Sequence, residues 1–405
     1  MDLVSGTSYW LLRNGLLASF PPLSGRRECD VAVLGAGVSG ALIAWHLARA
    51  GREVVVLDRR DAGTGSSVAS TGLVQYELDT PLSALGERIG PANAVRAYQA
   101  CRRAVLQLER IDRRLGGAGR LRRTGSVQGA SREAHVGALR AEAAARRLAG
   151  FELEWWDRRD VARESSLPFA AAIATPEAGQ VDTHRLTHAL LAAAARAGAH
   201  IVDRTSVVRR QALRSGVRLS TDRGFSVTAR QVVIATGYEA CRELPAGAAR
   251  LTSTFAFVSE PCPRPPGWPG TRTVWETARP YTYASLTDDH RLLAGGADVP
   301  WHNAARRDAQ TGRQARRVAR RLGGWLRPAP LEIAFSWGAT FAETPDGLPY
   351  IGRHPRRPHT FVALGYGGNG IPFSVVAAEI VRDLICEGAS RDADLFALER
   401  ARWRR

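Results

Sequence analysis

Residues 30–40 read Asp30–Val31–Ala32–Val33–Leu34–Gly35–Ala36–Gly37–Val38–Ser39–Gly40, an apolar, β-branched run that meets a glycine-rich turn. A helical pattern then runs from Ala41 to about Ala50, and a second apolar run over residues 53–57 closes on Asp58. The spacing predicts a strand, a turn of the form G-x-G-x-x-G, a helix and a second strand that ends in an acid. This βαβ unit places the chain in the α/β class.

Each glycine of the turn has a task that a larger residue would not perform. Gly35 permits the tight turn, Gly37 lets a pyrophosphate approach the backbone, and Gly40 lets the helix pack close to the strand. The start of the helix offers N–H groups and the positive end of a dipole to phosphates. Asp58 can accept ribose hydroxyls at the end of the second strand. The unit predicts a dinucleotide site, and the alternative is a glycine turn in an ordinary βαβ unit.

Three further segments carry glycine-bearing turns. The loop over residues 63–72 sets small hydroxyl residues between glycines, which suits contact with phosphates as well as a plain surface loop. Residues 224–229 and 231–237 predict a hairpin arm and a buried strand that ends in Ala-Thr-Gly. An apolar strand over 360–364 leads into Gly365–Tyr366–Gly367–Gly368–Asn369–Gly370. A helix follows to about Ile385, so this is a second strand–turn–helix unit.

The other elements are predicted from periodicity. Residues 1–28 read as a lead-in. Apolar residues at helical spacing predict helices over 91–115, 132–149, 184–198 and 303–326. Strand patterns cover 251–259, 273–295 with a turn at 288–290, and 332–337.

Composition sets broad limits on the function. The chain has 405 residues, of which 45% are hydrophobic, so it has room for a large core and two or three domains. Its formal net charge is +17, and all 56 basic residues are arginines because the sequence contains no lysine. A basic chain can contact anionic partners through phosphates. The arginines are scattered, which favours a solvated surface over a nucleic-acid-binding function.

The five cysteines are Cys29, Cys101, Cys241, Cys262 and Cys386. Their odd number, wide spacing and lack of a C-x-x-C pattern predict unpaired thiols in a reducing compartment. The sequence shows no convincing signal peptide and no apolar run of membrane-spanning length. These features predict a soluble, cytoplasmic protein.

His184 and His188 are the one pair with metal-ligand spacing, four residues apart in a predicted helix. A zinc site needs further ligands, and neither an H-E-x-x-H pattern nor a third ligand accompanies the pair. We therefore expect no metal site.

The glycine turns, the Ala235–Thr236–Gly237 strand end and the segment Asp346–Gly347–Leu348–Pro349–Tyr350–Ile351–Gly352–Arg353–His354–Pro355 together resemble the D-amino-acid-oxidase-like (DAO) family of FAD-dependent oxidoreductases. The resemblance runs from about Asp30 to Ile385. The late segment and its glycine turn are the more specific part and look like the end of glycine oxidases. The resemblance implies a Rossmann-like FAD-binding domain interleaved with a mixed-sheet substrate domain. On that pattern, residues 1–85, 171–243 and 338–405 form the FAD-binding domain, and residues 86–170 and 244–337 form the substrate domain.

The resemblance also implies which residues bind FAD. The adenosine and pyrophosphate would contact Gly35, Gly37, Val38, Ser39, Gly40, Asp58 and Arg59. The flavin would contact Ser66, Ser67, Thr71 and Gly72, the strand end Ala235, Thr236 and Gly237, and the late turn Gly367, Gly368, Asn369, Gly370 and Ile371. Family members that attach FAD covalently use a cysteine near the late strand. None lies between Cys262 and Cys386, so the resemblance implies a noncovalent FAD.

The reaction implied is hydride transfer to flavin N5 from the carbon beside the nitrogen of a small amine or amino acid. The resulting imine would be hydrolysed by water. Such a step needs an unprotonated amine but no dedicated base, so no catalytic acid–base pair is nominated. Substrate-facing candidates are Trp275, Arg279, Tyr281, Tyr283 and Phe341, with core packing as the equal alternative for the aromatic ones.

Two departures from the family affect the substrate and the electron acceptor. Glycine and D-amino-acid oxidases hold the substrate carboxylate with an arginine on the strand before the Asp-Gly turn. Phe341 stands at that position, so either Arg279 replaces the clamp or the substrate lacks a carboxylate there. Sarcosine oxidases use a lysine near the flavin for reaction with oxygen. This chain has no lysine, so oxygen and another electron carrier are both open as acceptor.

Two other functions remain open at this point. A related fold occurs in tRNA-modifying enzymes, and the basic charge makes an FAD-dependent enzyme acting on RNA an alternative. A nonenzymatic flavin-binding module is the other. The sequence gives no oligomeric state.

Overall fold

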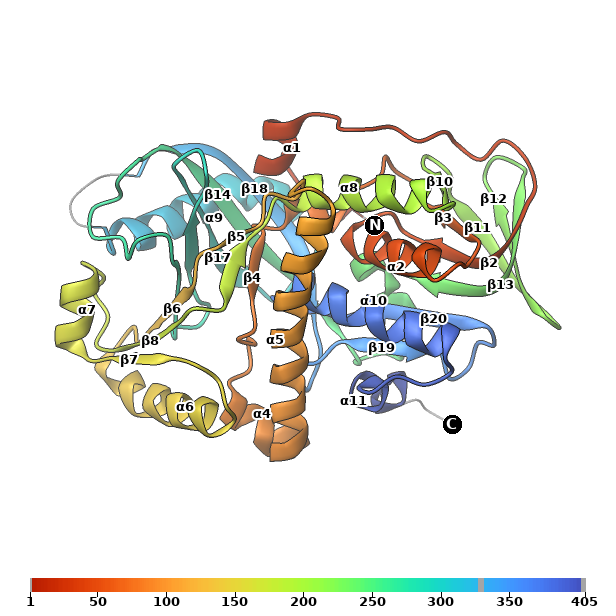
Figure 1. Cartoon of the computed structure of the whole chain (residues 1–405). Helices are drawn as coiled ribbons and strands as arrows, with labels where there is room; N and C mark the ends of the chain where they lie inside the picture. Colours follow the sequence, from red (N-terminus) through yellow and green to blue (C-terminus); the bar gives the residue numbers. More distant parts are fainter. Residues whose placement is uncertain (1, 327–330, 402–405) are drawn as a thin grey trace.

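Two large β-sheets organise the chain, and Figure 1 shows them on opposite sides of a central helix. The computed structural model describes residues 2–326 and 331–401. Within these residues one sheet has eight strands, a second has nine and a third has three. The predicted α/β class is confirmed, with a Rossmann-like sheet and a separate mixed sheet.

The first sheet grows from the βαβ unit. β2 (Arg27–Leu34) runs parallel to β3 (Val54–Leu57) on one side and to β13 (Ser226–Ile234) on the other. β3 pairs in parallel with β10 (His200–Val202), and β13 with β20 (Thr360–Leu364). Every residue of β3 is buried, as expected for a parallel strand covered on both faces. The antiparallel strands of this sheet are β11 (Val207–Leu213), β12 (Gly216–Thr221) and β19 (Tyr350–Arg353).

β13 contains two segments predicted from the sequence. Residues 224–229 and 231–237 were expected to form a hairpin arm and a buried strand, and residues 226–234 form both as one continuous strand. Its first half pairs with β12 and its second half with β20. The residues between the halves, Ala229, Arg230 and Gln231, include no glycine, proline or asparagine to turn the chain.

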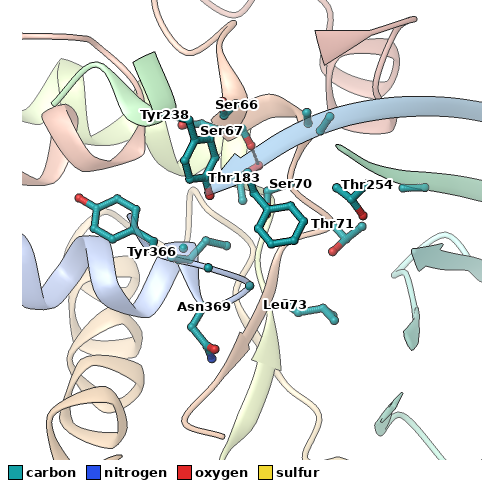
Figure 2. Close-up of a pocket in the computed structure, with 18 of the residues that line it drawn as sticks. Ser66, Ser67, Ser70, Thr71, Leu73, Thr183, Tyr238, Thr254, Tyr366 and Asn369 are labelled. Atoms are coloured by element: carbon teal, nitrogen blue, oxygen red, sulfur yellow. Dashed lines mark hydrogen bonds between the residues drawn. The ribbon is translucent and has the colours of Figure 1, made fainter. Parts of the chain in front are cut away.

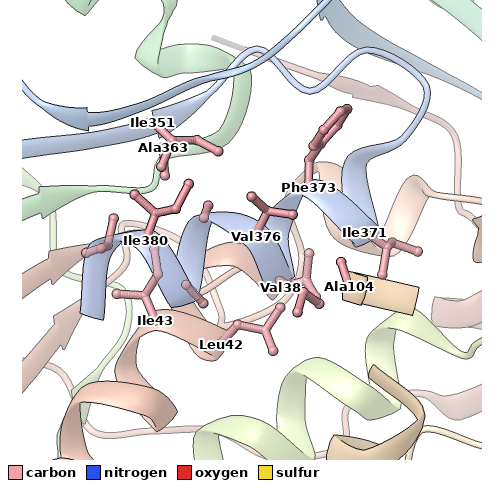
Figure 3. Packing of buried hydrophobic residues seen from close by; sticks show 14 of the residues in the cluster. Val38, Leu42, Ile43, Ala104, Ile351, Ala363, Ile371, Phe373, Val376 and Ile380 are labelled. Carbon is pink, nitrogen blue, oxygen red and sulfur yellow. The ribbon is translucent and has the colours of Figure 1, made fainter. Parts of the chain in front are cut away.

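Two helices pack on this sheet with their amino-terminal ends close together. α2 (Val38–Arg49) follows β2, and α10 (Gly370–Cys386) follows β20. Figure 3 shows Leu42 and Ile43 of α2 opposite Val376 and Ile380 of α10, and all four are buried in one core cluster. The two helices are almost uniformly apolar, so they belong in the interior rather than on the surface. This packing brings together turns that lie far apart in the sequence.

The second sheet has the strand order β1-β18-β14-β17-β16-β15-β6-β8-β7. β14 (Arg250–Pro261) pairs antiparallel with β17 (Arg291–Val299) and β18 (Ile333–Glu343) at its centre. α9 (Ala304–Gly323) packs on one face of these strands and buries Val318 and Leu322 there. The remaining strands are β1 (Val4–Ser5), β6 (Ser126–Gly129), β7 (Glu154–Trp156), β8 (Ala172–Thr175), β15 (Thr273–Glu276) and β16 (Tyr283–Leu286).

The central helix of Figure 1 is α5 (Pro91–Arg114), which stands between the two sheets. The three-stranded sheet consists of β4 (Leu73–Gln75), β9 (Ala178–Gln180) and β5 (Arg122–Arg123). The other helices are α1 (Tyr9–Asn14), α3 (Ser66–Ala69), α4 (Leu82–Ile89), α6 (Val136–Leu148), α7 (Arg158–Glu164), α8 (Thr183–Arg196) and α11 (Ala393–Phe396). Short 3₁₀ turns are η1 (Glu133–His135), η2 (Gly237–Glu243) and η3 (Leu398–Arg400). Across the described ranges, none of the helices has the length and apolarity that crossing a membrane requires.

Two short strands bear on the domain division. β1 lies in the lead-in segment but pairs with β18, and β8 pairs with β6 and β7. Both therefore join the second sheet, although the sequence-based limits put residues 1–85 and 171–243 in the FAD-binding domain. The division into domains stays a proposal, with sheet membership as its physical basis.

Candidate functional site

The first glycine turn is shaped by close backbone contacts. Gly35 has φ +105°, and a Cβ there would lie 2.4 Å from the carbonyl oxygen of Ala235. A Cβ on Gly40 would lie 1.8 Å from the carbonyl oxygen of Gly35. No L side chain fits at either position without moving backbone. Gly35 and Gly40 thus pack α2 and the strand end of β13 against β2, as the fingerprint requires.

Gly37 has a different role. Its backbone has the ordinary φ of −77°, and a Cβ there would meet only the Ser67 hydroxyl oxygen, at 2.9 Å. Gly37 is the residue before α2, whose first N–H, that of Val38, donates to the same Ser67 oxygen at 2.9 Å. The amino-terminal end of α2 therefore faces the 63–72 loop across a narrow gap that favours negative charge.

Asp58 follows β3 and forms hydrogen bonds that stabilise this turn. Its Oδ2 accepts the Ala36 N–H at 2.7 Å, and its Oδ1 accepts the Arg60 N–H at 2.9 Å. Burial raises the pKa of the Asp58 carboxyl above its usual range, although these two N–H donors and the Arg60 charge act to lower it. The adjacent Arg59 forms an ion pair with Glu239 of η2 at 2.6 Å.

The 63–72 loop is fixed by side chains from three other elements. Thr183 at the start of α8 donates to the Ser67 carbonyl at 2.7 Å. The Trp337 indole of β18 donates to the Ala69 carbonyl at 2.9 Å, and the Trp10 indole of α1 donates to the Ser70 carbonyl at 2.8 Å. The second sheet and the helices α1 and α8 therefore hold this loop in place.

The late glycine turn lies beside the first one. The Ser39 hydroxyl of α2 and the Ser374 hydroxyl of α10 share a hydrogen bond of 2.8 Å. The Asn369 amide, just before α10, donates to the Glu77 carbonyl at 2.9 Å. The Gly368 N–H donates to Asp79 Oδ2 at 2.8 Å. Two turns more than three hundred residues apart thus meet at the paired amino termini of α2 and α10.

A pocket opens where these turns meet the second sheet, and Figure 2 shows side chains from both converging on it. Most of the residues expected at the cofactor and substrate line it. They are Val38, Ser39, Ser66, Ser67, Thr71, Gly237, Gly367, Gly368, Asn369, Gly370, Ile371, Trp275, Tyr281, Tyr283 and Phe341. One cavity therefore reaches from the start of α2 to β14–β18.

Nine expected residues do not line the pocket. Gly35, Gly37, Gly40, Asp58, Ala235 and Thr236 form the turn at one end of it, Gly72 packs against the Val181 carbonyl, Arg59 pairs with Glu239, and Arg279 lies at the surface. The Arg279 guanidinium stacks on the Tyr281 ring at 4.9 Å and donates to the Asp79 carbonyl at 3.0 Å. Arg279 thus stands outside the cavity that an arginine clamp would serve.

One part of the pocket lining is aromatic. The Tyr281 ring lies 6.2 Å from Trp275 and 5.8 Å from Tyr283, centroid to centroid. Burial raises the pKa of Tyr283 to about 12 and that of Tyr281 well above its usual value, so both phenols are neutral. Tyr281 and Tyr283 both line the pocket.

The sequence analysis missed two acidic residues that line the pocket, Asp79 and Asp298. Asp79 follows β4, and its Oδ1 accepts the Tyr281 hydroxyl at 2.9 Å. Asp298 lies near the end of β17, and its Oδ1 is buried without a hydrogen-bond partner in the described structure. Burial raises the pKa of Asp298 to about 7; the Thr254 hydroxyl acts to lower it, and the negative charges of Asp79 and Glu343 act to raise it further. The Gly295–Gly296 pair could have indicated a β-bulge just before Asp298, because glycine inside a strand often marks a bulge.

His184 and His188 are not among the residues that line this pocket. Both are buried, with ring centroids 4.8 Å apart, and burial lowers the pKa of each. Among the pocket-lining residues that the structure describes, none is a cysteine or histidine.

Comparison with known proteins agrees with this geometry. A family model described as FAD dependent oxidoreductase (DAO) matches residues 30–384. Glycine oxidase of Geobacillus kaustophilus (strain HTA426) is 29% identical over 382 residues, covering 88% of this chain and 92% of that protein. Gamma-glutamylputrescine oxidoreductase of Escherichia coli (strain K12) is 25% identical over 403 residues, covering 96% and 91%.

A solved structure shows the same fold. The crystal structure of glycine oxidase from Geobacillus kaustophilus superposes with a TM-score of 0.76 at 27% sequence identity. The match covers 92% of this chain and 98% of that one. The similarity therefore extends over almost the whole chain rather than the nucleotide-binding unit alone.

Proposed function

The chain belongs to the DAO family of FAD dependent oxidoreductases, and from that premise we propose that it oxidises the C–N bond of a small amine or amino acid with a noncovalently bound FAD. One observation carries the proposal. The amino termini of α2 and α10 meet at a pocket whose opposite wall is aromatic. A dinucleotide would be held at one end by the first turn and at the other by the second.

The residues fit FAD. At the phosphate end, the start of α2 presents backbone N–H groups and a positive dipole, which suit a pyrophosphate. The Ser66 hydroxyl oxygen is buried at the pocket with no hydrogen-bond partner in the described structure, so a ligand group there would satisfy it. We propose that Gly367, Gly368, Asn369, Gly370 and Ile371 receive the flavin end at the start of α10, and that Asp58 receives the ribose.

When bound, FAD supplies the acceptor for the hydride removed from the carbon beside the nitrogen. The chain's own residues bind and orient the substrate. Trp275, Tyr281, Tyr283 and Phe341 form a wall that keeps water from the reacting carbon. The neutral phenols of Tyr281 and Tyr283 do not act as bases at neutral pH. This agrees with a step that needs an unprotonated amine and no dedicated base.

An anaerobic screen tests the proposed function. The FAD-loaded protein is mixed with a panel of amines and amino acids, and loss of the flavin absorbance is followed. At least one amine or amino acid is expected to bleach the flavin. A protein that fails to take up FAD, or whose flavin no member of the panel reduces, would contradict the proposal and favour a nonenzymatic module.

The cofactor is expected to leave the protein when the protein unfolds. None of the five cysteines lines the described pocket, so we propose that no thioether holds the flavin. Denaturation in acid or heat should release all of the yellow colour into the supernatant. The measurement is the flavin absorbance of supernatant and pellet, and colour that stays with the pelleted chain would disprove noncovalent binding.

The relatives reported above act, by their names, on glycine and on gamma-glutamylputrescine. They give no support to an enzyme acting on RNA. We keep oxygen and another carrier as alternative acceptors, since the chain offers no lysine to the pocket. Five free cysteines support a reducing, cytoplasmic location.

A further inference from the structure

The charge of the pocket points to a substrate class. Among its described lining residues are two carboxylates and no arginine, lysine or histidine. Phe341 of β18 is among the lining residues, and Arg279 is exposed outside the cavity. A substrate carboxylate in this pocket would find no cationic side chain among the described lining residues.

The two carboxylates are not equivalent. Asp79 is engaged, since its two oxygens accept the Gly368 N–H at 2.8 Å and the Tyr281 hydroxyl at 2.9 Å. Asp298 Oδ1 is buried and has no hydrogen-bond partner within the part of the chain described. A buried carboxylate oxygen without a donor is costly unless a ligand supplies one. Asp298 Oδ1 is therefore the pocket carboxylate oxygen that lacks a hydrogen-bond donor.

A β-bulge turns Asp298 into the pocket. Leu292, Ala294 and Ala297 all belong to the core cluster under α9, so the alternation of β17 shifts by one residue between Ala294 and Ala297. The strand register slips at the same place, where Ser253 pairs with Val299 but Phe255 pairs with Gly296.

The bulge places Ala297 in the left-handed region, with φ +55°. Unbroken alternation would leave Ala297 at the pocket and turn Asp298 toward α9. A left-handed alanine is strained, and bulges commonly re-aim side chains beside active sites. The strained residue, Ala297, comes directly before the residue whose carboxylate lines the pocket, Asp298.

Aromatic rings surround the same space. Trp275, Tyr281 and Tyr283 line the pocket together with Asp298. The Tyr281 ring centroid lies 6.2 Å from that of Trp275 and 5.8 Å from that of Tyr283. Aromatic faces attract cations, as the Arg279 guanidinium on Tyr281 shows at the rim. A carboxylate beside several aromatic faces is the chemistry that recognises an alkylammonium group.

We propose that Asp298, Trp275, Tyr281 and Tyr283 bind a cationic nitrogen of the substrate, so that the substrate is a diamine or polyamine whose second nitrogen is the one oxidised. The inference rests on the proposed amine oxidation and names its substrate class. The charged nitrogen donates to Asp298 Oδ1 and contacts the rings, while the nitrogen to be oxidised is unprotonated.

Three substrates of similar length test the inference on the unmodified holoenzyme: putrescine with a cationic far end, pentylamine with a methyl far end and δ-aminovalerate with an anionic far end. The measurement is kcat/KM for anaerobic flavin reduction. Putrescine is expected to exceed pentylamine by about 10-fold or more and δ-aminovalerate by about 100-fold or more. Equal values for putrescine and pentylamine, or a preference for δ-aminovalerate, would overturn the inference.

A conservative variant assigns the preference to Asp298. Asp298→Asn keeps the side-chain size and should lower kcat/KM for putrescine about 30-fold or more, while pentylamine changes less than about 3-fold. The matched control is Asp308→Asn, on the exposed side of α9, which should leave both values unchanged. Equal losses for the two amines in Asp298→Asn would mean a merely structural role.

A binding readout that needs no turnover separates the possible failures. Protonated tert-butylamine keeps its N–H donors but has no hydrogen on the carbon beside its nitrogen, so it is not oxidised, and its Kd follows from perturbation of the bound flavin spectrum. We expect Asp298→Asn to weaken this binding about 10-fold or more, with FAD retained. Unchanged binding, with amino acids reducing the flavin, would refute the inference and leave the proposed function standing. If no amine or amino acid reduces the flavin, both fail.

Discussion

Replacing Gly37 with valine is expected to weaken FAD binding by about 100-fold or more while the protein remains folded. Gly37 has a φ that valine adopts without strain, and its Cβ would approach only the Ser67 hydroxyl, a side-chain group that can rotate aside. The fold therefore tolerates the side chain. The added methyl groups would stand at the start of α2, in front of the N–H groups that we propose to face the pyrophosphate.

The measurement is the FAD dissociation constant, from quenching of flavin fluorescence on titration into the apoprotein. Gly137→Val is the matched control, because Gly137 is exposed at the start of α6 and a Cβ there meets nothing within 4 Å. The control should bind FAD like the wild type. Wild-type affinity in Gly37→Val would show that the phosphates lie elsewhere.

Replacing Gly368 with alanine is expected to act on the other end of the cofactor. A Cβ at Gly368 would lie 2.7 Å and 2.9 Å from the two Asp79 carboxylate oxygens and 3.0 Å from the Tyr281 hydroxyl. The methyl group must therefore disturb the hydrogen bonds by which Asp79 joins the Gly368 turn to Tyr281. We expect anaerobic flavin reduction to slow by about 100-fold or more, since small misplacement at a reacting centre is costly.

FAD affinity should fall only about 10-fold in Gly368→Ala, because the phosphate end of the site is unchanged. Gly323→Ala at the end of α9 is the control, since a Cβ there meets nothing within 4 Å. The account would be contradicted if Gly368→Ala lost FAD binding while Gly37→Val bound FAD and reduced it at the wild-type rate.

Local patterns were sufficient to predict the cofactor end of the fold. The apolar run of β3 and the glycine turn before α2 are governed by neighbours in sequence, and α5 (Pro91–Arg114) matches the helix expected over 91–115. Helix periodicity and glycine requirements are properties of short segments. The late turn before α10 was recognised for the same reason, and the structure places it beside the first.

Local sequence patterns did not predict features that depend on contacts between distant parts of the chain. The pairing of β1 with β18 joins residues more than three hundred positions apart. The orientation of Asp298 depends on a one-residue slip of β17 against β14, and a slip of one residue reverses the face of every later side chain. Asp79 was missed because its partners, Gly368 and Tyr281, are supplied by remote segments.

The central claim is that two turns from opposite ends of the chain hold one FAD between them. A crystal structure of the FAD-loaded protein tests it most directly. The account predicts the pyrophosphate at Gly37 and Val38, and the isoalloxazine ring between the Gly367–Gly370 turn and the wall of Trp275 and Tyr283. A cofactor that contacts only one of the two turns, or whose ring points away from the β14–β18 sheet, would contradict it.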